Sequence, residues 1–389
     1  MSKSSWKIAA RLLPLACLSI LPAAQAQSGP ATPAIYERLQ RAGLIDPYFP
    51  EVIVELATPL AQAAQGKWKR VQVNAPWRAD ALNIYQVDAE KIPPDFSLEN
   101  EGIAEFSPEM LSGGALSSRR TQTIFLNTTA SKRAAAVAVL QRISGEPLIK
   151  SLARVDAAGL AASEKLWSPA TFANGSKPVQ NAILLLRGST TFVLAHEMGH
   201  LLASEGAAPA RPVVRARSLT DRQKDERAAC PEMLVEDFQI QRAAESAADL
   251  AATRLLGLQC RIGSDAAIRH EVNQLGMQWY FLGAMSDKML QAARRTQSPI
   301  IARQLQIMLG PELYQQAVVA PSSGDRKAGA VKPLFPASHP PDYARVQAIE
   351  EALAKSPCGG QVGDHSLEQM MENYRLQMCR GLVADNRTR

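Results

Sequence analysis

The stretch FVLAHEMGHLL, residues 192–202, constrains this chain more than any other. His196 and His200 stand four residues apart in an apolar run, and Glu197 directly follows the first of them. In a helix, positions i and i+4 lie on one face one turn apart, so both imidazoles can point at a single atom. Zinc takes nitrogen ligands at about 2.0–2.1 Å, and this spacing supplies two of them. The stretch therefore predicts a helix that carries part of a metal site.

The carboxylate beside the first histidine indicates catalysis rather than a purely structural site. From its position, Glu197 can take a proton from activated water and later deliver it to a leaving amine. The preceding AILLLRGSTT favours a strand over 182–186 and a turn. We expect Ser189 or Thr190 to cap a helix over 190–204.

A catalytic zinc site needs a third protein ligand. A third histidine would require glycine at Ala203 and histidine at Gly206, so that version of the motif fails. The stretch AAESAADLAA, 243–252, instead offers Glu245 and Asp249 one turn apart on one helix face. We expect Glu245 to complete the coordination and Asp249 to orient a ligand histidine, while the alanines let the two helices approach closely. The rival ligands are Glu232, Glu236 and Asp237.

HEMGH followed by ESAAD resembles the paired motifs of gluzincin zinc metallopeptidases. This group includes the HtpX heat-shock protease, the CAAX prenyl proteases and exported outer-membrane quality-control proteases. The later ASHPPDYARVQAI, 337–349, is similar to a motif of the same family, and the three motifs lie within 190–350. The resemblance implies one zinc ion per chain, with His196, His200 and Glu245 as its ligands and Glu197 as the general base.

The resemblance also bears on two later residues. His339 occupies the position of a late histidine that stabilises the oxyanion in the family; the alternative is a helix-entry histidine before Pro340. Arg345 is expected to be a structural partner of acidic groups. The membrane-spanning helices and the C-terminal repeat array of well-known members are absent, and residues 27–180 match no member.

The first 26 residues have the layout of a secretory signal peptide. Lys3, Lys7 and Arg11 precede a short apolar run, and AQA ends at Ala26, the expected cleavage point. Cleavage would lower the formal net charge from +6 to about +3, which is too mild to indicate nucleic-acid binding. We therefore predict a periplasmic or secreted protein without a transmembrane segment in its mature form.

Four cysteines remain after that cleavage, and an even number in an exported chain suggests disulfides. Of the three pairings, we favour Cys230–Cys260 with Cys358–Cys379; free buried thiols are the alternative.

The segment 205–231 joins the two expected metal-bearing helices. Its composition indicates a solvated loop, and a mobile lid is the minority hypothesis. His270 lacks a second histidine four residues on, and His365 lies in a polar turn.

Strand-like runs at 70–74, 82–87 and 123–127 precede a region that is almost wholly helical, so the fold class is α+β with a zincin-like core. We expect helical spacing over 34–65 and helices at 131–143, 232–257, 265–295, 300–318, 340–355 and 364–380. The expected parts are the signal peptide at 1–26, an α+β region at 27–180, the metallopeptidase core at 181–355 and a C-terminal helix and tail at 356–389.

These observations favour an exported zinc endopeptidase that acts on protein or peptide substrates, in envelope protein quality control by family analogy. That analogy also places the substrate along a sheet edge near 182–188. The alternatives are a zinc-dependent cell-wall amide hydrolase and a zinc-stabilised periplasmic chaperone or scaffold with little turnover. An intact Glu197 argues against the scaffold, since a structural site does not need it.

Overall fold

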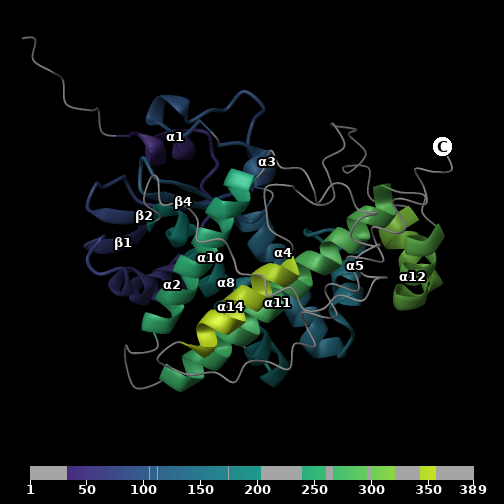
Figure 1. The fold of residues 1–389 in the computed structure, drawn as a ribbon. Helices are drawn as coiled ribbons and strands as arrows, with labels where there is room; N and C mark the ends of the chain where they lie inside the picture. The colour runs from purple at the N-terminus through teal and green to yellow at the C-terminus, as the bar shows by residue number, and fades with distance from the viewer. Residues whose placement is uncertain are drawn as a thin grey trace, which may run out of the picture. The chain divides into compact units, whose positions relative to one another are not determined.

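A small mixed sheet and a larger set of helices make up the described part of the chain (Figure 1). The computed structural model describes residues 33–202 except 105, 112 and 174, together with 239–259, 266–295, 299–319 and 342–355. This arrangement confirms the α+β class. The signal sequence, all five cysteines, His339, His365, the segment 205–231, the rival ligands at 232, 236 and 237, and the expected helix at 364–380 lie outside the described residues.

The sheet has the order β1-β2-β4-β3. Strands β1 (Arg70–Val73), β2 (Ala81–Val87) and β4 (Thr123–Asn127) run parallel and confirm the three expected strands. The edge strand β3 (Ala115–Ser118) runs antiparallel to β4, with Leu116 opposite Phe125. Its sequence, ALSS, is typical of a turn, but an edge strand tolerates polar residues along its length, so the same residues can form β3.

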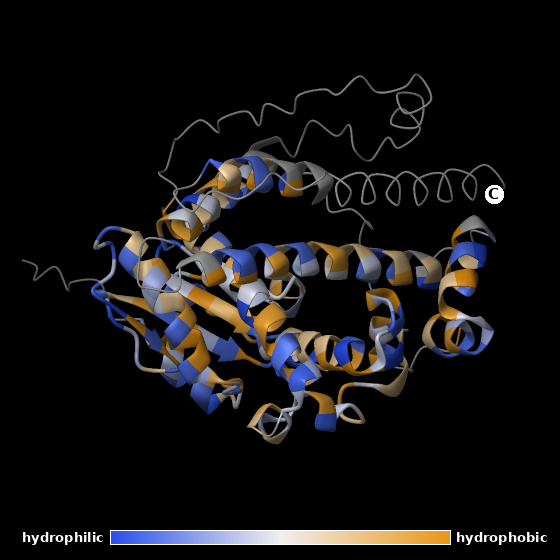
Figure 2. Cartoon of the chain, turned by 90° about the horizontal axis from the view of Figure 1, so that it is seen from below, coloured by the Kyte–Doolittle hydropathy of each residue, from blue (hydrophilic) through white to orange (hydrophobic). Residues whose placement is uncertain are grey.

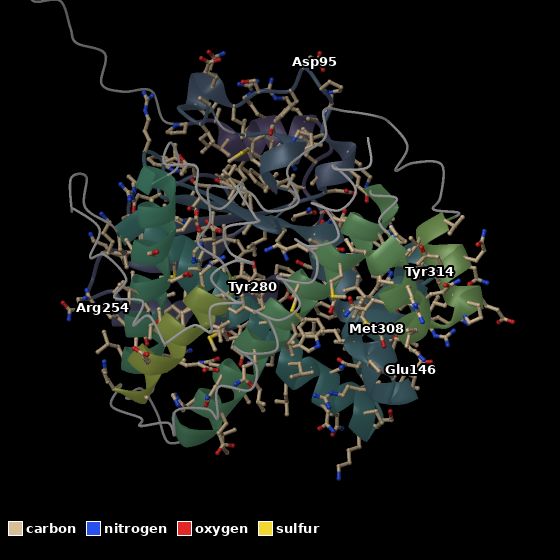
Figure 3. All side chains as sticks on the ribbon, turned by 45° about the vertical axis from the view of Figure 1, so that its right-hand side comes forward. Asp95, Glu146, Arg254, Tyr280, Met308 and Tyr314 are labelled. Atoms are coloured by element: carbon tan, nitrogen blue, oxygen red, sulfur yellow. The ribbon has the colours of Figure 1, made fainter. Side chains whose placement is uncertain are left out.

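Both faces of the sheet are covered, as parallel strands require. Leu82 and Ile84 belong to a core shared with the helices α2, α8, α10, α11 and α14, whereas Tyr85 and Val87 face a second core beside α1. A third core fills the space among α4, α5, α8, α11 and α12. Exposed Asp95 and Arg254 project from the periphery of the view in Figure 3, while half-buried Tyr280 lies among packed side chains.

Most expected helices are present with shifted bounds. The 34–65 stretch forms α1 (Ile35–Arg41) and α2 (Pro50–Ala63), which are separated by a segment that contains Gly43 in a left-handed conformation and Pro47. The expected 300–318 helix is broken at Gly310 (φ 82°) and Pro311. The further described helices, including one π-helical segment, are α3 (Pro108–Leu111), α4 (Thr128–Ser144), α5 (Leu148–Ala158), α6 (Glu164–Trp167), α7 (Pro169–Ala173), α10 (Gln239–Gln259), α11 (Ala266–Arg295), α12 (Pro299–Leu309), α13 (Pro311–Tyr314), the π-helix Gln315–Val319 and α14 (Asp342–Ala354).

The histidine-bearing helix α8 runs from Lys177 to Leu202 without a break, so the expected strand at 182–186 and the turn after it are wrong. Ser189 and Thr190 lie inside this helix and do not cap it. Its C-terminal half, from Gly188 onward, is mostly buried, and the helix contacts α2, α4, β3, α10 and α11. Its N-terminal half has an exposed face, but Leu184 on that face is apolar and 47% exposed, so the run AILLL shows no polar side and resembles a buried strand.

The expected boundary between residues 180 and 181 falls within α8, whose two halves belong to different cores. No described helix is long and apolar enough to cross a membrane. Figure 2 agrees, since hydrophilic positions interrupt the hydrophobic ones along the coloured helices.

Backbone contacts hold α8 against α11. A Cβ atom added to Gly276 would lie 2.2 Å from the Gly188 carbonyl carbon and 2.3 Å from the Ser189 nitrogen. One added to Gly188 would lie 2.1 Å from the Val272 carbonyl oxygen. Neither glycine can gain a side chain unless the two helices separate, because backbone atoms cannot swing aside.

We therefore expect Gly276→Ala to lower the free energy of unfolding by about 3 kcal/mol, the upper end of overpacking costs. Gly283→Ala, in the same helix, is the matched control, because nothing lies within 4 Å of its added Cβ. That control should raise stability by up to about 1 kcal/mol through helix propensity. Urea denaturation measures both, and equal stabilities for the two variants would contradict the contact.

Candidate metal centre

Two helices bring His196, His200 and Glu245 together. One ligand atom from each residue lies within 4.8 Å of the others, a grouping that could hold a metal ion. The two Nε2 atoms of the histidines are 3.1 Å apart. Glu245 places Oε2 3.2 Å from Nε2 of His196 and Oε1 3.5 Å from Nε2 of His200. The structure thus places all three predicted ligands around one point.

The second nitrogen of the His196 ring is also bonded. Its Nδ1 lies 2.8 Å from Oδ1 of Asp249, one turn after Glu245 in α10. This contact leaves Nε2 of the same ring directed at the Glu245 carboxylate. A metal-binding histidine is commonly fixed in this way, with a carboxylate holding its ring orientation and tautomer. The predicted orienting role of Asp249 therefore agrees with the geometry.

Arg345 from α14 anchors Asp249. Its Nε donates to Oδ2 of the carboxylate at 2.8 Å and its Nη2 to Oδ1 at 2.9 Å. Both side chains are buried, and the guanidinium also lies 5.3 Å from the Phe281 ring centre. A two-pronged pair of this kind fixes the carboxylate plane as well as its position. The expectation that Arg345 partners acidic groups is thus given a specific partner.

These contacts set the charge of the apo site. Burial disfavours the charged imidazolium, but hydrogen bonds to Asp249 and Glu245 outweigh it and raise the pKa of His196 to about 9. Burial of the Asp249 carboxyl is likewise outweighed by Arg345 and His196, which hold its pKa well below the usual range. In the metal-free protein, the His196 ring therefore carries a proton on both nitrogens near neutral pH. A metal ion must displace that proton when it binds.

The spacing of the ligands depends on a close approach of α8 and α10. Gly199 lies between the two histidines along α8, and a Cβ added there would be 2.5 Å from the carbonyl oxygen of Ala248. Ala248 precedes Asp249 and is fully buried. The small residues of HEMGH and ESAAD are therefore structural, because they let the two helical backbones touch where the ligands face each other.

Glu197 is buried, with 8% of its surface exposed. It forms no hydrogen bond or ion pair within the part of the chain that the structure describes. Its carboxylate oxygens keep access to solvent, so a water molecule or an ion can reach them. It lies one residue after His196 and three before His200, so its side chain is on the edge of the ligand-bearing face.

A cation reaches the end of α8 from the sheet. The Nε of Arg119, in the turn between β3 and β4, donates to the carbonyl oxygen of His200. This contact ties the turn after the edge strand β3 to α8 at the candidate metal ligand His200.

Sequence reasoning identified the three candidate ligands and Asp249 but missed Gly199 and Arg119. The glycine could have been found, because it is the smallest residue inside the motif and any helix that supplies a third ligand must cross there. Arg119 carried no such signal, since its contact depends on the unpredicted strand β3.

The chain matches no protein-family model, no curated protein and no solved structure. Its chemistry is therefore inferred from its own side chains.

Replacing Asp249 with Asn removes the charge that fixes His196 while keeping the side-chain shape. We expect metal affinity to fall about 10- to 100-fold, as for other carboxylates that orient a ligand histidine. Titration with Zn²⁺ against a competing chelator measures the change. Asp287→Asn is the matched control, because it also removes a carboxylate from an arginine, Arg133, but belongs to another core. Equal affinities in the two variants would contradict the role of Asp249.

Proposed function

We propose that this protein is an exported zinc-dependent endopeptidase of the gluzincin type. The observation that carries the proposal is the convergence of His196, His200 and Glu245 beside Glu197, a buried carboxylate without a partner among the described residues. An open three-ligand site with an adjacent base is typical of hydrolytic zinc centres.

The donor set fits zinc in kind and in size. Two imidazoles and one carboxylate are the ligand set of one class of catalytic zinc sites. Bonds of about 2.0–2.1 Å in a tetrahedral array place ligand atoms about 3.3–3.4 Å apart. The three closest separations, 3.1, 3.2 and 3.5 Å, lie near that value before any ion binds.

The protein groups have distinct tasks in the proposed reaction. Zinc, when bound, would lower the pKa of water and polarise the peptide carbonyl. Glu197 would take the proton from the attacking water and deliver it to the leaving nitrogen. Asp249 and Arg345 would keep the His196 ring in place throughout. His339, outside the described residues, keeps its proposed role at the oxyanion.

The expected substrate edge near 182–188 is wrong, because these residues are helical. The edge strand that contacts α8 is β3, which pairs with β4 on one side. An extended peptide can add to such an edge through main-chain hydrogen bonds. We therefore assign this role to β3 in the proposed peptidase.

The first test is the zinc content of the purified chain and of Glu245→Ala. We expect about one zinc per chain in the parent and clear loss in the variant, because two histidines alone make a weak site. Glu271→Ala, which removes an exposed carboxylate of α11, should retain zinc like the parent. Zinc held equally by all three proteins would move the third ligand elsewhere, with Glu236 the next candidate.

The second test separates catalysis from metal binding. Glu197→Gln keeps the side-chain size and should retain zinc, but we expect hydrolysis of unfolded casein to fall at least about 100-fold, since a general base contributes that much. The readout is the release of new amino termini. Undiminished proteolysis with retained zinc would exclude Glu197 as the base. Client binding without turnover in both proteins would favour the chaperone alternative, and release of peptidoglycan fragments the amide hydrolase.

A further inference from the structure

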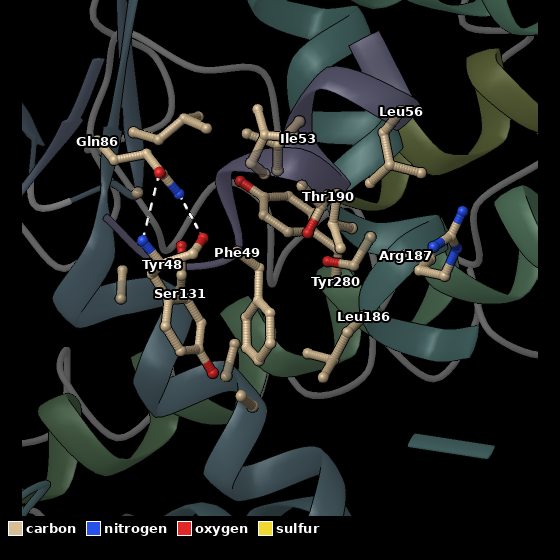
Figure 4. Close-up of a pocket in the computed structure, with 18 of the residues that line it drawn as sticks. Tyr48, Phe49, Ile53, Leu56, Gln86, Ser131, Leu186, Arg187, Thr190 and Tyr280 are labelled. Carbon is tan, nitrogen blue, oxygen red and sulfur yellow. Dashed lines mark hydrogen bonds between the residues drawn. The ribbon is translucent and has the colours of Figure 1, made fainter. Parts of the chain in front are cut away.

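A cavity lies where the helices α2, α4, α7, α8 and α11 meet the ends of β2 and β4 (Figure 4). Its volume is about 360 Å³, which falls in the range of small-ligand sites, about 300–1,000 Å³. Close-packed interiors rarely leave voids larger than a water molecule. Most of the residues that line it are aliphatic or aromatic. The cavity thus has the size and the surface of a site for an apolar ligand.

One wall of the cavity is aromatic and held in place. The Phe49 ring lies 4.7 Å from the Tyr48 ring and 5.5 Å from the Phe172 ring, both edge-on. Phe49 has φ 51° and ψ 53°, a left-handed backbone conformation that is strained for a bulky residue. Such strain persists only where the surroundings impose it. Here the Gln86 amide binds the backbone nitrogen and the carbonyl oxygen of the preceding Tyr48, as the dashed lines in Figure 4 show.

Other polar groups of the lining are also bonded within the protein. The Tyr48 hydroxyl donates to the carbonyl oxygen of Trp167. The Ser131 hydroxyl donates to the carbonyl oxygen of Asn127, one turn earlier in the chain. These groups are satisfied without a ligand, so they do not call for a polar one.

Arg187 is the one charged residue among the described residues that line the cavity. It belongs to α8 and lies at one edge of the cavity in the view of Figure 4. Its guanidinium binds both carboxylate oxygens of Glu55 in α2, with Nη1 3.1 Å from Oε2 and Nη2 in contact with Oε1. The guanidinium therefore already presents two donors to a carboxylate at the edge of an apolar cavity.

The carboxylate that Arg187 now holds is replaceable. The Glu55 side chain is 61% exposed and the Arg187 side chain 31%. An ion pair in such an exposed place contributes little to stability, because water screens it. Another carboxylate can therefore take the place of Glu55 at low cost, and Glu55 can turn to solvent.

We propose that this cavity binds a fatty acid, with the hydrocarbon chain among the aliphatic and aromatic side chains and the carboxylate on Arg187. A lining with one cation matches a molecule that is apolar except for one anionic end. A peptide segment inside the cavity would instead bring main-chain polar groups that this lining cannot satisfy. The assignment does not depend on the proposed peptidase function, because none of the three candidate metal ligands lines the cavity.

The first test removes the charge from either partner. The metal-free full chain is titrated with the fluorescent fatty acid cis-parinaric acid and with its uncharged methyl ester. We expect Arg187→Gln to weaken binding of the acid about tenfold or more, since hydrogen bonds between charged groups contribute that much. Binding of the ester should not change. Arg154→Gln is the matched control, because it also separates an exposed arginine from a glutamate, Glu146, and it should change neither affinity.

A second variant should act in the opposite direction. The hydrogen bond from Arg187 lowers the pKa of Glu55, so this carboxylate is charged near neutral pH and competes for the guanidinium. Glu55→Gln should therefore strengthen binding of the acid by about two- to fivefold, the value of an exposed ion pair, and leave the ester unchanged. A merely structural role of the pair predicts no such gain.

A third variant fills the cavity. Ala134 lines it from α4, so Ala134→Trp should weaken binding of the acid and of the ester alike, by about tenfold or more. Ala157→Trp, at an exposed site of α5, is the matched control and should bind both like the parent. If Ala134→Trp does not fold, Ala130→Leu fills the same cavity from one turn earlier.

Three results would overturn the assignment. A parent that binds neither probe would show that the chain itself or a second copy fills the cavity. Equal affinities for the acid and the ester in the parent would exclude a role for Arg187 and with it the fatty acid. Displacement of the acid by a randomised peptide mixture would make the occupant a polypeptide. None of these measurements involves zinc or cleavage, so the peptidase proposal is tested separately.

Discussion

Direct contact between helical backbones underlies this structure. Helix α8 meets α11 where Gly188 faces Gly276, and it meets α10 where Gly199 faces Ala248. Both crossings are closer than any pair of side chains would permit, so the helix axes are set by main-chain atoms that cannot adjust. Ligand geometry follows from this constraint, because a metal site requires its donors to be held within a fraction of an ångström.

The same close approach makes it necessary to bury charge. Once α10 lies against α8, Asp249 and His196 are removed from water, and an isolated carboxylate there would be costly. Arg345 supplies the compensating cation from a third helix, α14. The hydrogen bonds among Arg345, Asp249 and His196 offset the cost of desolvating these charges. They also give the His196 imidazole one defined orientation. The ion pair contributes more to the precision of the site than to net stability.

Much of the site was predictable because its chemistry is local. The helical repeat sets the spacing of His196 from His200 and of Glu245 from Asp249. Each pair can therefore be recognised from a few neighbouring residues. The pairing of Arg345 with Asp249 could be expected only as a class of contact, since 96 residues separate them. The strand expected at 182–186 was wrong because Leu184, on the exposed face of the helix, is itself apolar and leaves the run without a polar side.

The elements that pack on α8 come from both sides of it in the sequence, which has a consequence for the order of folding. Its neighbours α2, α4 and β3 precede it along the chain, whereas α10 and α11 follow it. During synthesis the helix therefore emerges with half of its covering still to be made, and its apolar surface stays exposed until α11 has formed. Arg345, which anchors the carboxylate that orients His196, arrives later still, with α14. An incomplete chain thus contains both histidines without the contacts that orient His196, and the site forms last.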